Sequence, residues 1–190
     1  MDLILRSQAG DEDAFAALFH QHKNLVYKTA YLMLGSAGEA EDVLQEVFLR
    51  VHESLATFQP SKGAFTTWLY RITVNHCLNR RRKRHLLVLP LAEVSPTSLT
   101  DHSPSPEGRL GKEEAVQQAL SRLSEKLRAV VILRYYWEAS YADIAQSLNI
   151  PVGTVKSRLN LALKTLRKEL ETMTEDAPAP NAFPQREVAK

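Results

Sequence analysis

The sequence predicts an all-α fold of two helical domains joined by a flexible linker, with a helix-turn-helix as the second domain. Three observations support this. Apolar residues recur at three- and four-residue spacing in both halves of the chain. The stretch 86–111, rich in proline and serine, lacks that spacing. Between residues 141 and 170, a short helical pattern, a tight turn and a longer helical pattern follow one another.

The first half is predicted to hold three helices. Asp11 can cap the first, and Gly35 ends it because glycine adopts the left-handed conformation that often closes a helix. Ser36 and Glu39 have the spacing of a capping box for the second. The apolar face of this second helix should pack on the first; it consists of Val43, Leu44, Val47, Phe48, Val51 and Leu55.

Turn-forming residues separate the second helix from the third. The stretch 58–63 contains Pro60 and Gly63 and is predicted to be a loop. A third helix follows from about Ala64 and ends in the basic run Arg80 to Arg84. These helices define a first domain at 1–85.

The second domain is predicted at 112–171, after the flexible linker 86–111. Ser124 can cap a helix that runs to Trp137, and Ser140 with Asp143 resembles a capping box for a short helix through Leu148. Asn149 suits a tight turn, and the helix beyond it runs to about Leu170. The tail 172–190, which contains Pro178 and Pro180, is expected to be disordered.

Composition limits the class of protein. With 44% hydrophobic and 24% charged residues, the chain is expected to be globular, and it has no run of 18 apolar residues that could cross a membrane. Its first residues lack the apolar core of a secretory signal, so we expect a cytoplasmic protein without membrane insertion. The single Cys77 excludes an internal disulfide.

The net charge of +2 hides an uneven distribution of charges. Residues 1–55 hold nine acids and four bases, whereas residues 56–92 hold seven bases and no acid. Residues 127–170 again hold seven bases, against three acids. Two basic segments separated by a more acidic stretch indicate two separate contacts with a polyanion.

No catalytic constellation is evident. A glycine-rich phosphate loop after a strand and a nucleophile elbow are both missing from the sequence. The histidines show no metal-ligand pairing, and His20 and His22 are interpreted as solvated surface residues. We therefore expect a non-enzymatic protein without cofactor or metal.

Two segments carry groups suited to nucleic acid. The longer helix of the helix-turn-helix opens with short polar and basic residues that can reach bases and phosphates, namely Thr154, Lys156, Ser157 and Arg158. A solvated helical hairpin is the alternative. The helix after the loop combines aromatic, amide and cationic groups suited to unpaired bases, namely Trp68, Tyr70, Arg71, Asn75, Asn79 and Arg80. Trp68 alone could equally be a core residue.

Three motifs follow one another along the chain, from Asp42 to Phe48, from Phe65 to Asn75 and from Pro151 to Arg158. In sequence and in order they resemble motifs of the extracytoplasmic-function group of bacterial sigma factors. The resemblance implies that the first domain is region two, which binds the beta-prime clamp helices of core RNA polymerase and opens the promoter −10 element. It implies that the second is region four, which recognises the −35 element as duplex and touches the beta flap.

The resemblance also implies roles for single residues. Polymerase contact is expected from the second helix, at Glu41, Asp42, Leu44, Gln45 and Phe48, although Leu44 and Phe48 also lie on the predicted core face. The −10 contacts are expected from the loop, which would capture a flipped base, and from the helix behind it, at Phe58, Lys62, Trp68, Arg71, Asn75, Asn79 and Arg80. The −35 contacts are expected at Thr154, Lys156, Ser157, Arg158, Asn160 and Lys164.

Leu161 and Leu163 depart from the group's pattern, because relatives often carry arginines there, and fewer phosphate contacts are expected as a result. The resemblance further implies an anti-sigma factor as a partner. The alternative function is a helix-turn-helix regulator that binds duplex DNA by itself. That alternative does not explain the aromatic and amide residues of the first domain.

Overall fold

The computed structural model describes residues 2–88 and 110–175, and the regular structure in these two ranges is entirely helical. The prediction of an all-α fold is therefore confirmed. The helices are α1 (Asp2–Gln8), α2 (Glu12–Leu34), α3 (Ala37–Ser54), α4 (Phe65–Val88), α5 (Leu110–Ser121), α6 (Glu125–Tyr135), α7 (Tyr141–Leu148) and α8 (Val152–Glu175), with short 3₁₀ turns η1 (Leu55–Thr57) and η2 (Pro60–Lys62). Most of the predicted linker and tail lies outside the described residues.

Local capping explains where α2 begins and ends. The Asp11 carboxylate accepts a hydrogen bond from the Ala14 N–H at 3.0 Å. Gly35 has a φ of 82°, in the left-handed region, and its N–H donates to the Tyr31 carbonyl at 2.8 Å. Both ends of this helix were predicted, whereas α1 was not.

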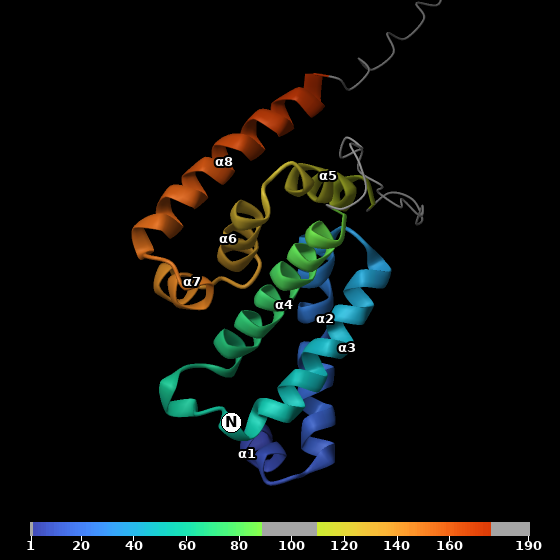
Figure 1. Cartoon of the computed structure of the whole chain (residues 1–190), viewed down its shortest axis with the longest axis vertical. Helices are drawn as coiled ribbons and strands as arrows, with labels where there is room; N and C mark the ends of the chain where they lie inside the picture. Colours follow the sequence, from blue (N-terminus) through green and yellow to red (C-terminus); the bar gives the residue numbers. More distant parts are fainter. Residues whose placement is uncertain (1, 89–109, 176–190) are drawn as a thin grey trace, which may run out of the picture.

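The first three long helices bury a shared core. Val43, Val47 and Val51 of α3 are fully buried, as are Leu69, Val74 and Cys77 of α4. Each such aliphatic side chain contributes about 1.5–3 kcal/mol by leaving water. Figure 1 shows α4 between the α2–α3 pair on one side and α6 and α7 on the other.

The second half contains the predicted helix-turn-helix. Ser140 Oγ accepts from the Asp143 N–H at 3.1 Å, and the Asp143 carboxylate accepts from the Ser140 N–H, which makes a complete capping box for α7. Asn149 takes the left-handed conformation at φ 50°, and α8 then begins at Val152. Ser124 precedes α6 as predicted, but its side chain makes no capping hydrogen bond.

The two halves pack against each other, which the sequence analysis did not predict. Arg128 of α6 is 3% exposed and donates to the carbonyls of Leu120, Ser121 and Leu123 in its own half. It also donates to the Met33 carbonyl of α2 at 2.7 Å. Burial lowers the pKa of Arg128 to about 10, so the guanidinium stays charged at neutral pH. One buried arginine thus ties the second half to the first.

Further hydrogen bonds reinforce this packing. The Trp137 indole N–H donates to Thr29 Oγ1 at 2.7 Å, and the Gln117 amide donates to the Tyr31 carbonyl at 3.2 Å. The rings of Tyr70 and Trp137 meet edge to face, with centroids 5.5 Å apart. The buried residues of both halves consequently form one continuous core. Within the described ranges, no helix is long and apolar enough to cross a membrane.

Candidate nucleic-acid interface

An aromatic cluster supports the loop before α4. Phe58 and Phe65 are each 7% exposed, and their ring centroids lie 5.7 Å apart at nearly right angles. Trp68 is half-buried, and its ring centroid lies 5.3 Å from that of Phe58 and 5.7 Å from that of Phe65. Phe58 was expected to contact nucleic acid. Its burial shows instead that it packs behind the loop.

The loop is held at its start by α1 and ends in a glycine of unusual backbone conformation. The Gln8 amide at the end of α1 donates to the carbonyls of Leu55 and Phe58, at 2.9 and 2.8 Å. Gly63 has φ 154° and ψ 172°, a conformation almost confined to glycine. Lys62, between these anchors, is exposed. The loop therefore presents a cation on a defined backbone.

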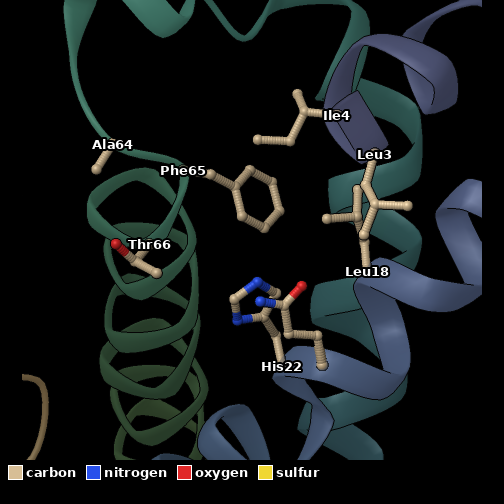
Figure 2. Close-up of a pocket in the computed structure, with 8 residues that line it drawn as sticks. Leu3, Ile4, Leu18, His22, Ala64, Phe65 and Thr66 are labelled. Atoms are coloured by element: carbon tan, nitrogen blue, oxygen red, sulfur yellow. The ribbon is translucent and has the colours of Figure 1, made fainter. Parts of the chain in front are cut away.

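A cavity of about 280 Å³ opens beside this loop, between α1, α2 and the first turn of α4. Figure 2 shows Phe65 and His22 facing into it, with Ile4 and Leu3 across from them. Gln21 and Thr66 add polar groups to an otherwise apolar lining completed by Leu18 and Ala64. The cavity is slightly smaller than most ligand pockets.

His22 is a residue whose environment sequence analysis misjudged. It was expected on the solvated surface, yet it is 8% exposed, and its ring centroid lies 5.3 Å from that of Phe65. Burial lowers the pKa of His22, so the neutral ring is favoured. Position 22 lies four residues after Leu18 and four before Val26, which are both buried. With 3.6 residues per turn, the three positions share one face of α2, so the sequence contained the signal for a buried His22.

The outer face of α3 is acidic and open. Glu41, Asp42 and Gln45 are exposed, as expected for a contact surface. Phe48 is 4% exposed and packs in the core, while Leu44 is half-buried. Both agree with the packing role that their place on the core face predicted.

Leu49 is an exposed apolar residue on this same face that the sequence analysis missed. It is 66% exposed and lies one turn beyond Gln45. The signal was present in the sequence, because position 49 falls outside the apolar repeat of Val43, Val47 and Val51. A single exposed leucine is common on protein surfaces, so Leu49 gains meaning only from the polar residues around it.

An ion-pair network joins this face to α4. Arg80 Nη2 lies 2.7 Å from an Asp42 carboxylate oxygen, and Arg80 Nη1 lies 3.3 Å from Glu46. His76 of α4 also pairs with Glu46. Arg80 was expected to contact nucleic acid. In the structure its guanidinium is bound to acids of α3.

Part of the α4 face is covered by the second half of the chain. The Asn75 amide donates to the Ser147 carbonyl of α7 at 3.3 Å. Arg71 and Asn79, one turn to either side, are exposed. The expected nucleic-acid residues of α4 therefore do not form one open surface in this arrangement.

The outer face of α8 is open and basic. Val155, Leu159 and Ala162 are buried against α6 and α7, so the opposite side of the helix faces solvent. The predicted residues Lys156, Ser157, Asn160 and Lys164 are exposed, and Thr154 and Arg158 are half-buried. The arrangement of α7, the Asn149 turn and α8 confirms the predicted helix-turn-helix. Among the described residues, no group of three or more His, Cys, Asp or Glu side chains could hold a metal ion.

Comparison with known families matches both halves. A model of sigma-70 region 2 matches residues 18–86, and a model of sigma-70 region 4 matches residues 113–166. The chain is 38% identical over 180 residues to the ECF RNA polymerase sigma factor SigW of Bacillus subtilis (strain 168), covering 90% of this chain and 96% of that protein. It is 34% identical over 185 residues to the RNA polymerase sigma-H factor of Pseudomonas aeruginosa, covering 92% of this chain and 95% of that protein.

Two solved structures with a similar fold contain a partner protein. The sigma factor RpoE bound to the anti-sigma factor NepR from Bartonella quintana is similar with a TM-score of 0.70 at 25% identity, covering 83% of this chain and 96% of that chain. CnrH in complex with the cytosolic domain of CnrY has a TM-score of 0.66 at 23% identity, covering 90% of this chain and 96% of that chain.

Proposed function

Since the chain belongs to the extracytoplasmic-function (ECF) family of RNA polymerase sigma factors, we propose that three of its surfaces divide the work of promoter recognition. The protein is an alternative sigma factor that directs RNA polymerase to specific promoters. The observation that carries this function is the presence of both sigma regions, in order, in one chain. A stand-alone regulator is not favoured, because it would need only the second region.

The first surface is the outer face of α3, which we assign to the beta-prime clamp helices of core polymerase. Exposed Glu41, Asp42 and Gln45 support the assignment, and exposed Leu49 adds an apolar centre. A few residues at the centre of a protein interface contribute most of its affinity, and a partner that covers Leu49 would remove its apolar surface from water. Phe48 and Leu44 support this face from the core side.

The second surface comprises the loop 58–63, the cavity beside it and α4, which we assign to the melted −10 element. Lys62, Arg71 and Asn79 are exposed and can meet phosphates and base edges. The cavity behind the loop, with the rings of Phe65 and His22 and the amide of Gln21, has the lining to hold one unstacked base. Phe58 and Trp68 hold this surface in shape.

The third surface is the outer face of α8, which we assign to the −35 element as duplex. Lys156 and Arg158 lie near the start of the helix, where long donors reach guanine edges, whereas Lys164 lies two turns further on and suits the phosphate backbone. Thr154, Ser157 and Asn160 supply shorter polar groups. The beta flap is the expected protein contact of this domain.

An anti-sigma factor is the further partner that we propose. Support comes from a similar solved structure, in which the sigma factor RpoE is bound to the anti-sigma factor NepR. We also propose that the protein acts in the cytoplasm, where core polymerase is found. Sigma factors are DNA-binding regulators of transcription initiation and not enzymes, so we assign no catalytic activity to this chain.

Run-off transcription with purified core polymerase tests the function. The protein should give a defined transcript from a promoter that core polymerase alone ignores, and should not protect that promoter from nuclease without polymerase. A footprint by the free protein, with no transcript from the holoenzyme, would favour the stand-alone regulator.

Substitution on α3 tests the polymerase surface. Gln45→Arg places a cation in an acidic face and should weaken core polymerase binding at least tenfold, measured by titration of labelled protein. Gln118→Arg, at an exposed glutamine on α5, is the matched control and should bind normally. Asp42→Arg is less suitable, because Asp42 pairs with Arg80 and the change would also disturb α4. Equal affinities for Gln45→Arg and Gln118→Arg would reject the α3 assignment.

A further inference from the structure

An exposed leucine lies in the middle of the basic face of α8. Leu161 is 55% exposed, four residues after Ser157 and three before Lys164. Residues three and four apart are neighbours on a helix surface, so Leu161 lies between two residues assigned above to the −35 element. The buried residues Val155 and Leu159 are on the other side of the helix.

Leu161 has no role in packing. It does not belong to the core of the described residues, nor to the half-buried apolar residues that pack against that core. Its backbone carbonyl accepts from Thr165 Oγ1 at 3.0 Å, a contact that any residue could provide. The side chain itself is therefore available to an external partner.

The charges around Leu161 identify the chemistry of that partner. From Ile144 to Lys168 the chain carries no acid, and five bases lie in the same stretch, namely Lys156, Arg158, Lys164, Arg167 and Lys168. A cation-rich helix face at the second helix of a helix-turn-helix fits the major groove of duplex DNA. The apolar group that base pairs display in that groove is the C5-methyl of thymine.

We propose that Leu161 contacts a thymine methyl group in the −35 element and is a specificity-determining residue of this sigma factor. The inference rests on the assignment of α8 to the −35 element. The flanking cations hold the helix against the phosphates, while Leu161 favours thymine at one position because only thymine offers it an apolar group.

Leu163 provides the matched control. It is 38% exposed, and it lies two residues further on, about 200° around the helix axis from Leu161. It is therefore the same residue type on the same helix, but it lies on the other side of the helix axis from Leu161, near the buried Leu159. Alanine at either position removes exposed apolar surface and should leave the melting temperature nearly unchanged.

The test uses holoenzyme on promoters in which each −35 thymine is replaced in turn by deoxyuridine, which lacks only the methyl group. In the parent protein one such replacement should weaken promoter binding roughly three- to tenfold. Leu161→Ala should abolish that difference between thymine and deoxyuridine, and Leu163→Ala should keep it.

Three other outcomes are distinguishable. If no deoxyuridine replacement affects the parent holoenzyme, or if Leu161→Ala keeps the difference, the methyl contact is disproved while promoter-directed transcription stands. If Leu161→Ala weakens thymine and deoxyuridine promoters equally, Leu161 contacts a protein such as the beta flap and the proposal is overturned. If the parent holoenzyme does not initiate at any promoter, the proposed function itself fails, together with this inference.

Discussion

At the scale of single residues, burial of His22 makes the stability of the protein depend on pH. Burial lowers the pKa of His22 in the folded protein, whereas in the unfolded chain a histidine has a pKa of about 6.5. Below that value the unfolded state binds a proton that the folded state does not. The free energy of unfolding therefore has its full value above about pH 6.5, and it decreases as the pH falls below that point.

Replacement of His22 should remove this dependence. We expect His22→Gln to lose less stability than the parent between about pH 7.5 and 5.5, with a difference of up to about 1 kcal/mol. Thermal unfolding followed by circular dichroism at several pH values measures it. His20→Gln, at an exposed position of the same helix, should retain the parent's pH dependence. Parallel pH profiles for the parent and His22→Gln would contradict the argument.

Residues whose roles depend on neighbours in the chain could be predicted from sequence. Asp11 and the pair of Ser140 and Asp143 cap helices as expected, because capping joins groups only three residues apart. Phe58 and Arg80 were placed on the nucleic-acid surface, yet one is buried and the other is paired with acids. Phe58 packs against the aromatic rings of α4, and the acids that pair with Arg80 lie on α3, so neither environment is contained in a linear pattern.

At the scale of elements, the turn between α7 and α8 decides how α8 is presented. Asn149 has a φ of 50°, where most residues with a Cβ are strained by about 1–2 kcal/mol. Its N–H donates to the carbonyls of Ala145 and Gln146 and so closes α7. Asparagine and glycine tolerate this conformation best.

A pair of substitutions at this turn should separate backbone strain from side-chain contact. Asn149→Ala should lower the free energy of unfolding by about 1 kcal/mol, while Asn149→Gly should change it little. Denaturant unfolding of the three proteins measures both values. If both variants lose the same stability, the Asn149 side chain matters and its backbone conformation does not.

The long helices were predictable from sequence and the shortest one was not. Helices α2, α3 and α4 show sustained apolar periodicity with recognisable ends, so their positions follow from local patterns. Helix α1 has seven residues, too few for periodicity to stand out. It owes its place to tertiary contacts, since Gln8 holds the loop carbonyls of Leu55 and Phe58.

At the scale of the whole molecule, the packing of the two halves covers part of the α4 face that we propose for contact with the −10 element. Asn75 donates to Ser147, and Trp137 bonds to Thr29 from the other half. These partners are 72 and 108 residues apart in sequence. Sequence patterns within each half predicted two domains, but they hold no information on contacts across such separations.

The same packing has a consequence for promoter opening. If Asn75 contacts melted DNA, its amide must first leave the Ser147 carbonyl, so α7 must move away from α4. The edge-to-face contact of Trp137 with Tyr70 and its bond to Thr29 hold the halves together at this place. We therefore expect the halves to separate when core polymerase and promoter DNA bind.

Fluorescence energy transfer between dyes at Glu53→Cys on α3 and Lys168→Cys on α8 measures that separation. The native Cys77 should not react, because it is buried and burial raises the pKa of its thiol to about 12. Transfer efficiency should fall when holoenzyme forms on a promoter. Trp137→Ala should lower it already in the free protein, because the indole's hydrogen bond and ring contact are lost together. Unchanged efficiency in the promoter complex would mean that α7 stays on α4, and Asn75 would then have to be removed from the −10 surface.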